Sequence, residues 1–90
     1  MNTEIRNYQM FSKAGNKACE SLVRKIEKKI FGTKRVTKEQ IEEMIKKGFE
    51  KIGQTHSEIG DSEPESDICF FINKALKQAG YAIEIDRFEL

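Results

Sequence analysis

The spacing of apolar residues limits what this chain can fold into more than any other feature of its sequence. In three separate stretches, apolar side chains recur every three or four residues, the period at which they line one side of an α-helix. The stretches predict helices over residues 13–31, 38–52 and 67–79. In the second of them, the shared face is formed by Ile41, Met44, Ile45, Phe49 and Ile52.

Local signals support the ends of these helices. Thr37 and Gln40 are spaced as a capping box, in which the Thr hydroxyl accepts the Gln amide and the Gln side chain reaches back to the Thr amide. Glycine stops each helix at its C-terminal end, at Gly32, Gly53 and Gly80. Gly48 instead lies on the apolar face of the second helix, which predicts that another helix packs closely against it.

The C-terminal stretch has a different period. Apolar and polar residues alternate from Tyr81 to Asp86, which predicts a strand over residues 81–88. A strand needs a partner for its backbone groups, and the candidates are the N-terminal segment 3–11, the connector 33–37 and the same strand of a second chain. Ile5 and Tyr8, three residues apart, also permit a helix in the N-terminal segment. The predicted fold class is α+β: three helices with a small two- or three-stranded sheet built on the C-terminal strand.

Length and composition indicate one small domain over residues 1–90. The sequence has no apolar run of about 18 residues and no signal peptide, so we expect a cytoplasmic protein without a membrane contact. In a reducing compartment, Cys19 and Cys69 are expected to be buried free thiols. A domain of this size has a thin stability margin, and a second copy of the chain is one way to widen it.

Charge is unevenly distributed along the chain. Residues 1–53 hold 13 basic and 7 acidic residues, a net charge of +6, whereas residues 54–90 hold 3 and 8, a net charge of −5. The two blocks are either solvated faces of one fold or a basic surface that meets an acidic partner. For a nucleic acid, the candidate contacts are Lys17, Arg24, Lys25, Lys28, Lys34, Arg35 and Lys38.

Acidic residues gather in the predicted loop 54–66 and at the start of the third helix, as Asp61, Glu63, Glu65 and Asp67. Their two-residue spacing is that of a calcium loop, but Ser66 and Ile72 occupy the positions that would need glycine and glutamate. No metal site is predicted, and the acids are expected to cap the helix.

Phe70 falls on the opposite side of the third helix from its apolar face. Either the N-terminal segment or the long loop covers it as part of the core, or it is an exposed aromatic beside an acidic rim. In the second case Phe70, Asp61, Glu63, Glu65 and Asp67 form a candidate surface for a protein partner.

Catalytic and cofactor motifs are missing from the sequence. His56 is the sole histidine and cannot be paired with a nucleophile from sequence, and neither a P-loop nor a dinucleotide-binding glycine motif occurs. We therefore expect a protein that is not an enzyme and has no cofactor. The predicted function is binding to a macromolecular protein partner, as a small inhibitor, immunity-type protein or adaptor.

Nucleic-acid binding is the alternative function. The connector at residues 33–36, the two helices after it and the segment LKQAGYAIEI resemble the helix-to-wing passage of winged-helix domains. The resemblance covers residues 33–86 and rests on spacing alone. The loop between the second and third helices is longer than a helix-turn-helix turn, and the third helix presents Asp67 and Phe70 where a basic surface would be expected.

Overall fold

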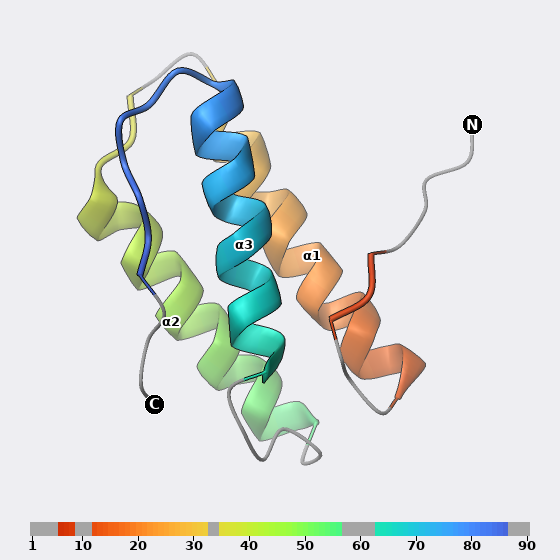
Figure 1. Ribbon diagram of the computed structural model, residues 1–90. Coiled ribbons are helices and arrows are strands. Elements are labelled where there is room, and N and C mark those ends of the chain that lie inside the picture. The colour runs from red at the N-terminus through yellow and green to blue at the C-terminus, as the bar shows by residue number, and fades with distance from the viewer. Residues whose placement is uncertain (1–5, 9–11, 33–34, 57–62, 87–90) are drawn as a thin grey trace.

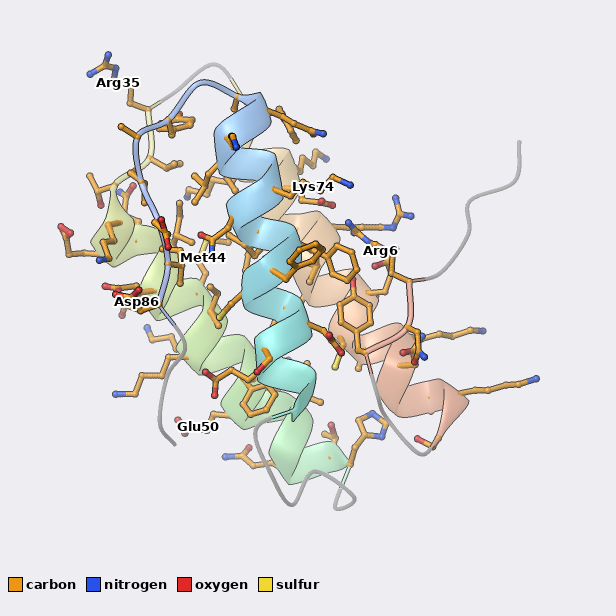
Figure 2. The ribbon with its side chains drawn as sticks, in the orientation of Figure 1. Arg6, Arg35, Met44, Glu50, Lys74 and Asp86 are labelled. Carbon is orange, nitrogen blue, oxygen red and sulfur yellow. The ribbon has the colours of Figure 1, made fainter. Side chains whose placement is uncertain are left out.

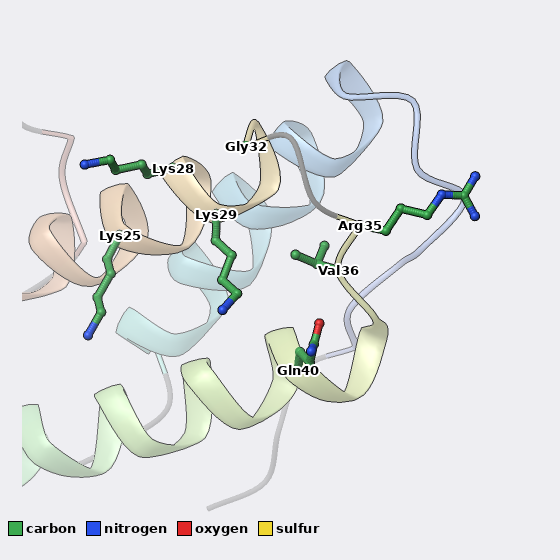
Figure 3. A pocket seen from close by; sticks show the side chains of 7 residues that line it. All are labelled: Lys25, Lys28, Lys29, Gly32, Arg35, Val36 and Gln40. Atoms are coloured by element: carbon green, nitrogen blue, oxygen red, sulfur yellow. The ribbon is translucent and has the colours of Figure 1, made fainter.

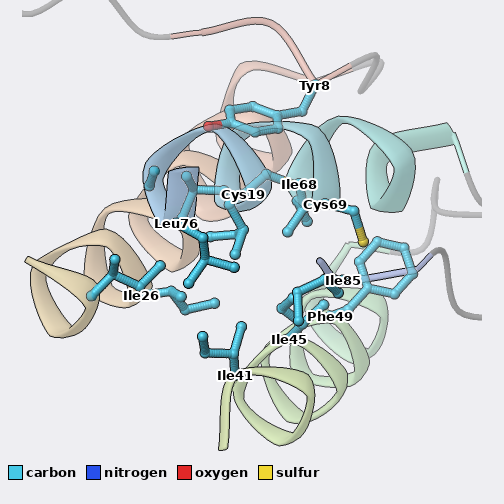
Figure 4. Packing of buried hydrophobic residues seen from close by; sticks show 14 of the residues in the cluster. Tyr8, Cys19, Ile26, Ile41, Ile45, Phe49, Ile68, Cys69, Leu76 and Ile85 are labelled. Atoms are coloured by element: carbon cyan, nitrogen blue, oxygen red, sulfur yellow. The ribbon is translucent and has the colours of Figure 1, made fainter. Parts of the chain in front are cut away.

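The computed structural model describes residues 6–8, 12–32, 35–56 and 63–86. Three α-helices occupy most of these ranges: α1 (Lys13–Ile30), α2 (Lys38–Thr55) and α3 (Glu63–Gln78). Helix α1 packs against both α2 and α3 (Figure 1). The side chains between the helices form a core, which includes Tyr8, Cys19, Val23, Ile26, Ile45, Phe49, Ile68, Ile72, Leu76 and Ile85 (Figure 4). None of the described helices has the length and apolar character that crossing a membrane requires.

Side-chain caps fix the starts of α1 and α2. The Ser12 hydroxyl accepts a hydrogen bond from the Gly15 amide at 2.9 Å. The capping box at the start of α2 is present: the Gln40 amide donates to the Thr37 hydroxyl at 3.2 Å, and the Thr37 amide donates to Gln40 Oε1 at 3.0 Å. These bonds satisfy amides that the helix itself leaves without a partner.

Helix α2 continues past the glycine that was expected to end it. It runs to Thr55, whereas the sequence predicted an end at residue 52 before Gly53. Among the described glycines only Gly80 has a positive φ, so Gly53 does not make the left-handed turn that stops a helix. The last turn is closed instead by the His56 amide, which donates to the Ile52 carbonyl at 2.7 Å.

Helix α3 begins four residues earlier than the predicted start at residue 67. Pro64 lies in its first turn, where a missing N–H costs no hydrogen bond. The C-terminal end follows the expectation for Gly80, whose φ is 86°. The Gly80 amide donates to the Lys77 carbonyl at 3.1 Å and the Tyr81 amide to the Leu76 carbonyl at 2.9 Å, the bonding pattern of a Schellman motif.

The predicted α+β class is wrong. No residue in the described ranges forms a strand, and the architecture there is an all-helical bundle. Residues 81–86, predicted as most of a strand over 81–88, form no strand and pair with no neighbouring strand in the described ranges, and residues 87 and 88 lie outside those ranges. In Figure 1 this segment descends beside α3 and over α2, and Ile85 reaches the core with an exposed fraction of 3%.

Asparagine side chains explain why no sheet is needed. Asn73 on α3 donates from Nδ2 to the Ile85 carbonyl at 2.9 Å, and the Ile85 amide donates to Asn73 Oδ1 at 2.7 Å. Asn16 on α1 acts in the same way, since its Nδ2 donates to the Arg6 carbonyl at 2.8 Å and its Oδ1 accepts the Tyr8 amide at 2.7 Å. A primary amide has a donor and an acceptor, like a peptide group, and can therefore replace a neighbouring strand.

The other candidate strands have no support where they are described. Of the N-terminal segment 3–11, residues 6–8 are described, and they form neither strand nor helix. Of the connector 33–37, residues 35–37 are described and are not a strand. The wing implied by the winged-helix resemblance is thus missing from residues 81–86. Of the predicted acidic loop 54–66, residues 57–62 lie outside the described ranges, whereas residues 54–55 belong to α2 and residues 63–66 to α3.

Candidate functional site

Phe70 lies on the outside of α3 with 62% of its surface exposed. The N-terminal segment does fold over the third helix, but it covers the next residue instead. The ring of Tyr8 meets the ring of Phe71 edge-on, with centroids 5.4 Å apart. The ring of Phe70 also packs edge-on against the ring of Phe71, with centroids 5.3 Å apart. Of the two alternatives for Phe70, the structure therefore has the exposed one.

Arg6 completes this surface, which we call the aromatic patch: Arg6, Phe70 and Phe71, supported by the buried Tyr8. Arg6 is labelled in Figure 2, and its guanidinium carbon lies 4.5 Å from the centre of the Phe71 ring, a cation–π arrangement. Two further bonds hold the guanidinium, from Nη1 and Nη2 to the Glu27 carboxylate, each at 2.9 Å. The hydrogen bond with Glu27 raises the pKa of Arg6, which burial opposes and Glu20 reinforces. The Phe71 ring is consequently packed against a guanidinium whose position is fixed by its bonds to Glu27.

Glu20 anchors the N-terminal segment from below the patch. Its carboxylate, 5% exposed, accepts hydrogen bonds from Arg6 Nε at 3.0 Å, from Arg24 Nε at 2.8 Å and from the Tyr8 hydroxyl. Burial pushes the pKa of Glu20 upward, but the bonds from Tyr8 and Arg6 outweigh it and the pKa is lowered. Burial also raises the pKa of Tyr8. A carboxylate held ionised by three donors positions the patch and is poorly suited to act as a general acid.

Two of the four acidic candidates, Glu65 and Asp67, have side chains that the structure describes. Glu65 is fully buried and Asp67 is half-buried in α3. Asp67 acts on the thiol of Cys19, whose pKa is raised to about 11 mainly by burial and secondarily by this charge. Asp61 and the side chain of Glu63 lie outside the part of the chain that is described. Phe70 is thus the candidate that the structure places on the surface.

The basic candidates divide into three groups. Lys25, Lys28 and Arg35 line a hollow of about 460 Å³ between the end of α1 and the start of α2, together with Lys29 (Figure 3). Arg24 is paired with Glu20, and Lys38 lies 4.0 Å from Asp86. Lys17 is exposed on α1, and Lys34 lies outside the described ranges.

Reactive chemistry has little to build on in the described ranges. His56 follows α2, where its backbone closes the last turn. Cys19 and Cys69 are buried free thiols, and the raised pKa of Cys19 disfavours its nucleophilic thiolate. No three His, Cys, Asp or Glu side chains within those ranges are grouped as metal ligands.

Sequence reasoning missed Arg6, Glu20 and Lys29. Arg6 and Glu20 meet across 14 residues, and no local period marks such a pair. Lys29 had a usable signal, because it follows Lys25 by four residues and therefore shares its side of the helix.

Comparisons of the chain with protein families, with characterised proteins and with solved structures found no match. A proposal about the function of this protein therefore rests on the surfaces of its own structure.

Proposed function

We propose that this protein binds a protein partner through the aromatic patch and performs no chemistry on it. The observation that carries the proposal is Phe70, a large apolar side chain exposed to 62% on a preorganised base. A single exposed aromatic is common on protein surfaces. This one differs because its neighbour Phe71 is fixed by Tyr8 and Arg6.

Preorganisation is what makes such a residue useful in binding. Aromatic and arginine side chains dominate the energetic centres of interfaces. Rings already held in place lose little conformational freedom on association. Arg6 forms ion pairs with Glu20 and Glu27 in the absence of a partner. The surface around Phe71 would therefore lose little conformational entropy on binding.

Burial of one phenylalanine gives the expected size of the effect. Covering its side chain is worth about 1.5–3 kcal/mol. That energy corresponds to roughly a ten- to hundred-fold change in an association constant. Phe70 alone can accordingly decide whether a moderate interaction is detectable.

The test compares Phe70→Ser with Phe31→Ser, a matched control at the end of α1 whose phenylalanine is 54% exposed. Each protein is immobilised and incubated with an extract of its own host, and sedimentation is run on each to detect self-association. We expect a partner, or a second copy, that the wild type and Phe31→Ser retain and Phe70→Ser loses.

Thermal melts by circular dichroism accompany the binding assay. All three proteins should melt at similar temperatures, because neither phenylalanine is buried. A melt several degrees lower for Phe70→Ser would assign the residue to the core. Identical retention by all three proteins, with a monomeric wild type, would also reject the aromatic patch as the binding surface.

A further inference from the structure

A second surface of the molecule has a different chemistry. Arg35 marks it at one end of the bundle, well away from Arg6 and the aromatic patch (Figure 2). Here the last two turns of α1 and the start of α2 enclose the hollow of about 460 Å³. We call it the basic pocket, with the four cations Lys25, Lys28, Lys29 and Arg35. In Figure 3, Lys25 and Lys29 extend from α1 toward α2.

Every polar side chain that lines the basic pocket can offer a donor. Within the part of the chain that the structure describes, the lining holds the four cations, Gln40, Gly32 and Val36, and includes no carboxylate. The oxygen of Gln40 already accepts the Thr37 amide, so the free part of its side chain is the NH₂ group. A hollow with this lining suits a ligand that has only acceptors.

Ion pairs neutralise some of the described cations, and the four of the basic pocket are among those that no ion pair neutralises. Arg6 is paired with Glu20 and Glu27, Arg24 with Glu20, and Lys47 with Glu43. Among the residues that the structure describes, no ion pair involves any cation of the basic pocket. In Figure 3, Lys28 and Arg35 point away from the hollow, so the like charges that face it are those of Lys25 and Lys29. These two charges repel each other, and a bound anion relieves that repulsion.

Helix capping accounts for only part of this charge. Lys28 and Lys29 lie in the last turn of α1, where cations stabilise the C-terminal end of a helix dipole. Lys25 precedes that turn, and Arg35 lies beyond the helix. The C-terminal end of α1 carries a partial negative charge and the N-terminal end of α2 a partial positive charge, and both ends border the pocket. These partial charges offset each other, so the electrostatic potential in the pocket comes mainly from the side chains.

We propose that the basic pocket binds phosphate groups. Phosphate oxygens are acceptors with a high negative charge, lysine meets them as a point charge, and arginine meets them with two parallel N–H bonds. A small oligophosphate and the backbone of a nucleic acid strand share this chemistry. The binding does not depend on the aromatic patch.

The experiment uses two probes on the full chain. A fluorescein-labelled single-stranded oligodeoxythymidine is followed by fluorescence anisotropy, and unlabelled tripolyphosphate is then added as a competitor. The variant is Lys25→Gln/Lys29→Gln. The control is Lys74→Gln/Lys77→Gln, which removes the same charge from two exposed positions of α3.

The variant should bind the oligonucleotide at least tenfold more weakly, whereas the control should change less than twofold. The slope of log affinity against log salt should also fall in magnitude by about 1.4, since each phosphate contact to a single strand contributes about 0.7. Displacement by tripolyphosphate would identify a site that also takes small oligophosphates, and failure to displace would assign it to the strand. No binding by the wild type, or equal losses in variant and control, would overturn the proposal.

Discussion

Gly48 gives the most direct test of how α1 and α2 pack. An ideal Cβ built on this residue would lie 2.3 Å and 2.7 Å from the two methyl carbons of Leu22 on α1 and 3.0 Å from its Cγ, where ordinary contacts begin at 3.4 Å. Gly48→Ala therefore forces Leu22 to move. The closest atoms are the methyl ends of a flexible and only partly buried side chain, so the cost does not exceed the roughly 1–3 kcal/mol of overpacking a core. The gain in helix propensity offsets it by only ~1 kcal/mol.

We expect Gly48→Ala to lower the free energy of unfolding by up to about 2 kcal/mol, the difference between these two terms. Gly53 supplies the control, because it lies in the same helix and an ideal Cβ built on it would have no neighbour within 4 Å. Gly53→Ala should stabilise the protein by up to ~1 kcal/mol. Both values come from urea denaturation followed by far-UV circular dichroism.

A double-mutant cycle isolates the contact itself. In a Leu22→Ala background the clash is gone, so Gly48→Ala should become stabilising by up to ~1 kcal/mol. The coupling energy between the two positions should then be no more than about 1–3 kcal/mol, equal to the overpacking cost. If Gly48→Ala stabilises the wild type as much as Gly53→Ala does, the close approach of the two helices is refuted.

Two further predictions concern the extended segments. Asn73→Ala leaves the Ile85 amide and carbonyl without their partner, so it should cost about 1–3 kcal/mol and speed hydrogen exchange at the Ile85 amide; unchanged exchange would contradict the role of Asn73. The pKa of Glu20 is lowered in the folded state, so its stabilisation is present above the unfolded pKa of about 4.3 and is lost as the pH falls further. Melting temperatures should accordingly drop more steeply with acid in the wild type than in Glu20→Gln, and parallel curves would show that the bonds from Tyr8 and Arg6 do not stabilise the ionised form.

Whether the end of a helix could be predicted from the sequence depended on whether its signal is contained within a few neighbouring residues. The capping box was readable because Thr37 and Gln40 satisfy each other within one turn. Gly80 was readable because a left-handed residue must come after the last turn of α3. Gly53 misled the prediction, since the same residue type fits a helix interior, and its φ depends on the path of the chain beyond it.

The candidate site was only partly predictable for a related reason. Phe70 was identified because it departs from the apolar period of its own helix. Whether it was covered depended on the path of residues 6–8, which cover Phe71 instead. Glu65 was expected near the surface, where charge usually lies, yet it is buried in the bundle.

The sequence by itself determined the three helices, because their apolar period and caps act over a few residues. The alternation over residues 81–86 correctly indicated which side chains face the bundle, since Ile85 is buried and its neighbours Glu84 and Asp86 are exposed, but the strand that it predicted is wrong. What pairs with that segment was decided only by the tertiary structure. An extended segment requires hydrogen-bond partners for its backbone groups, but the alternation does not identify those partners. In the packed structure, Asn73 on α3 is the partner of the Ile85 amide and carbonyl. The difference between an α+β domain and a helical bundle therefore depends on long-range contacts of two asparagines, for which local periodicity carries no signal.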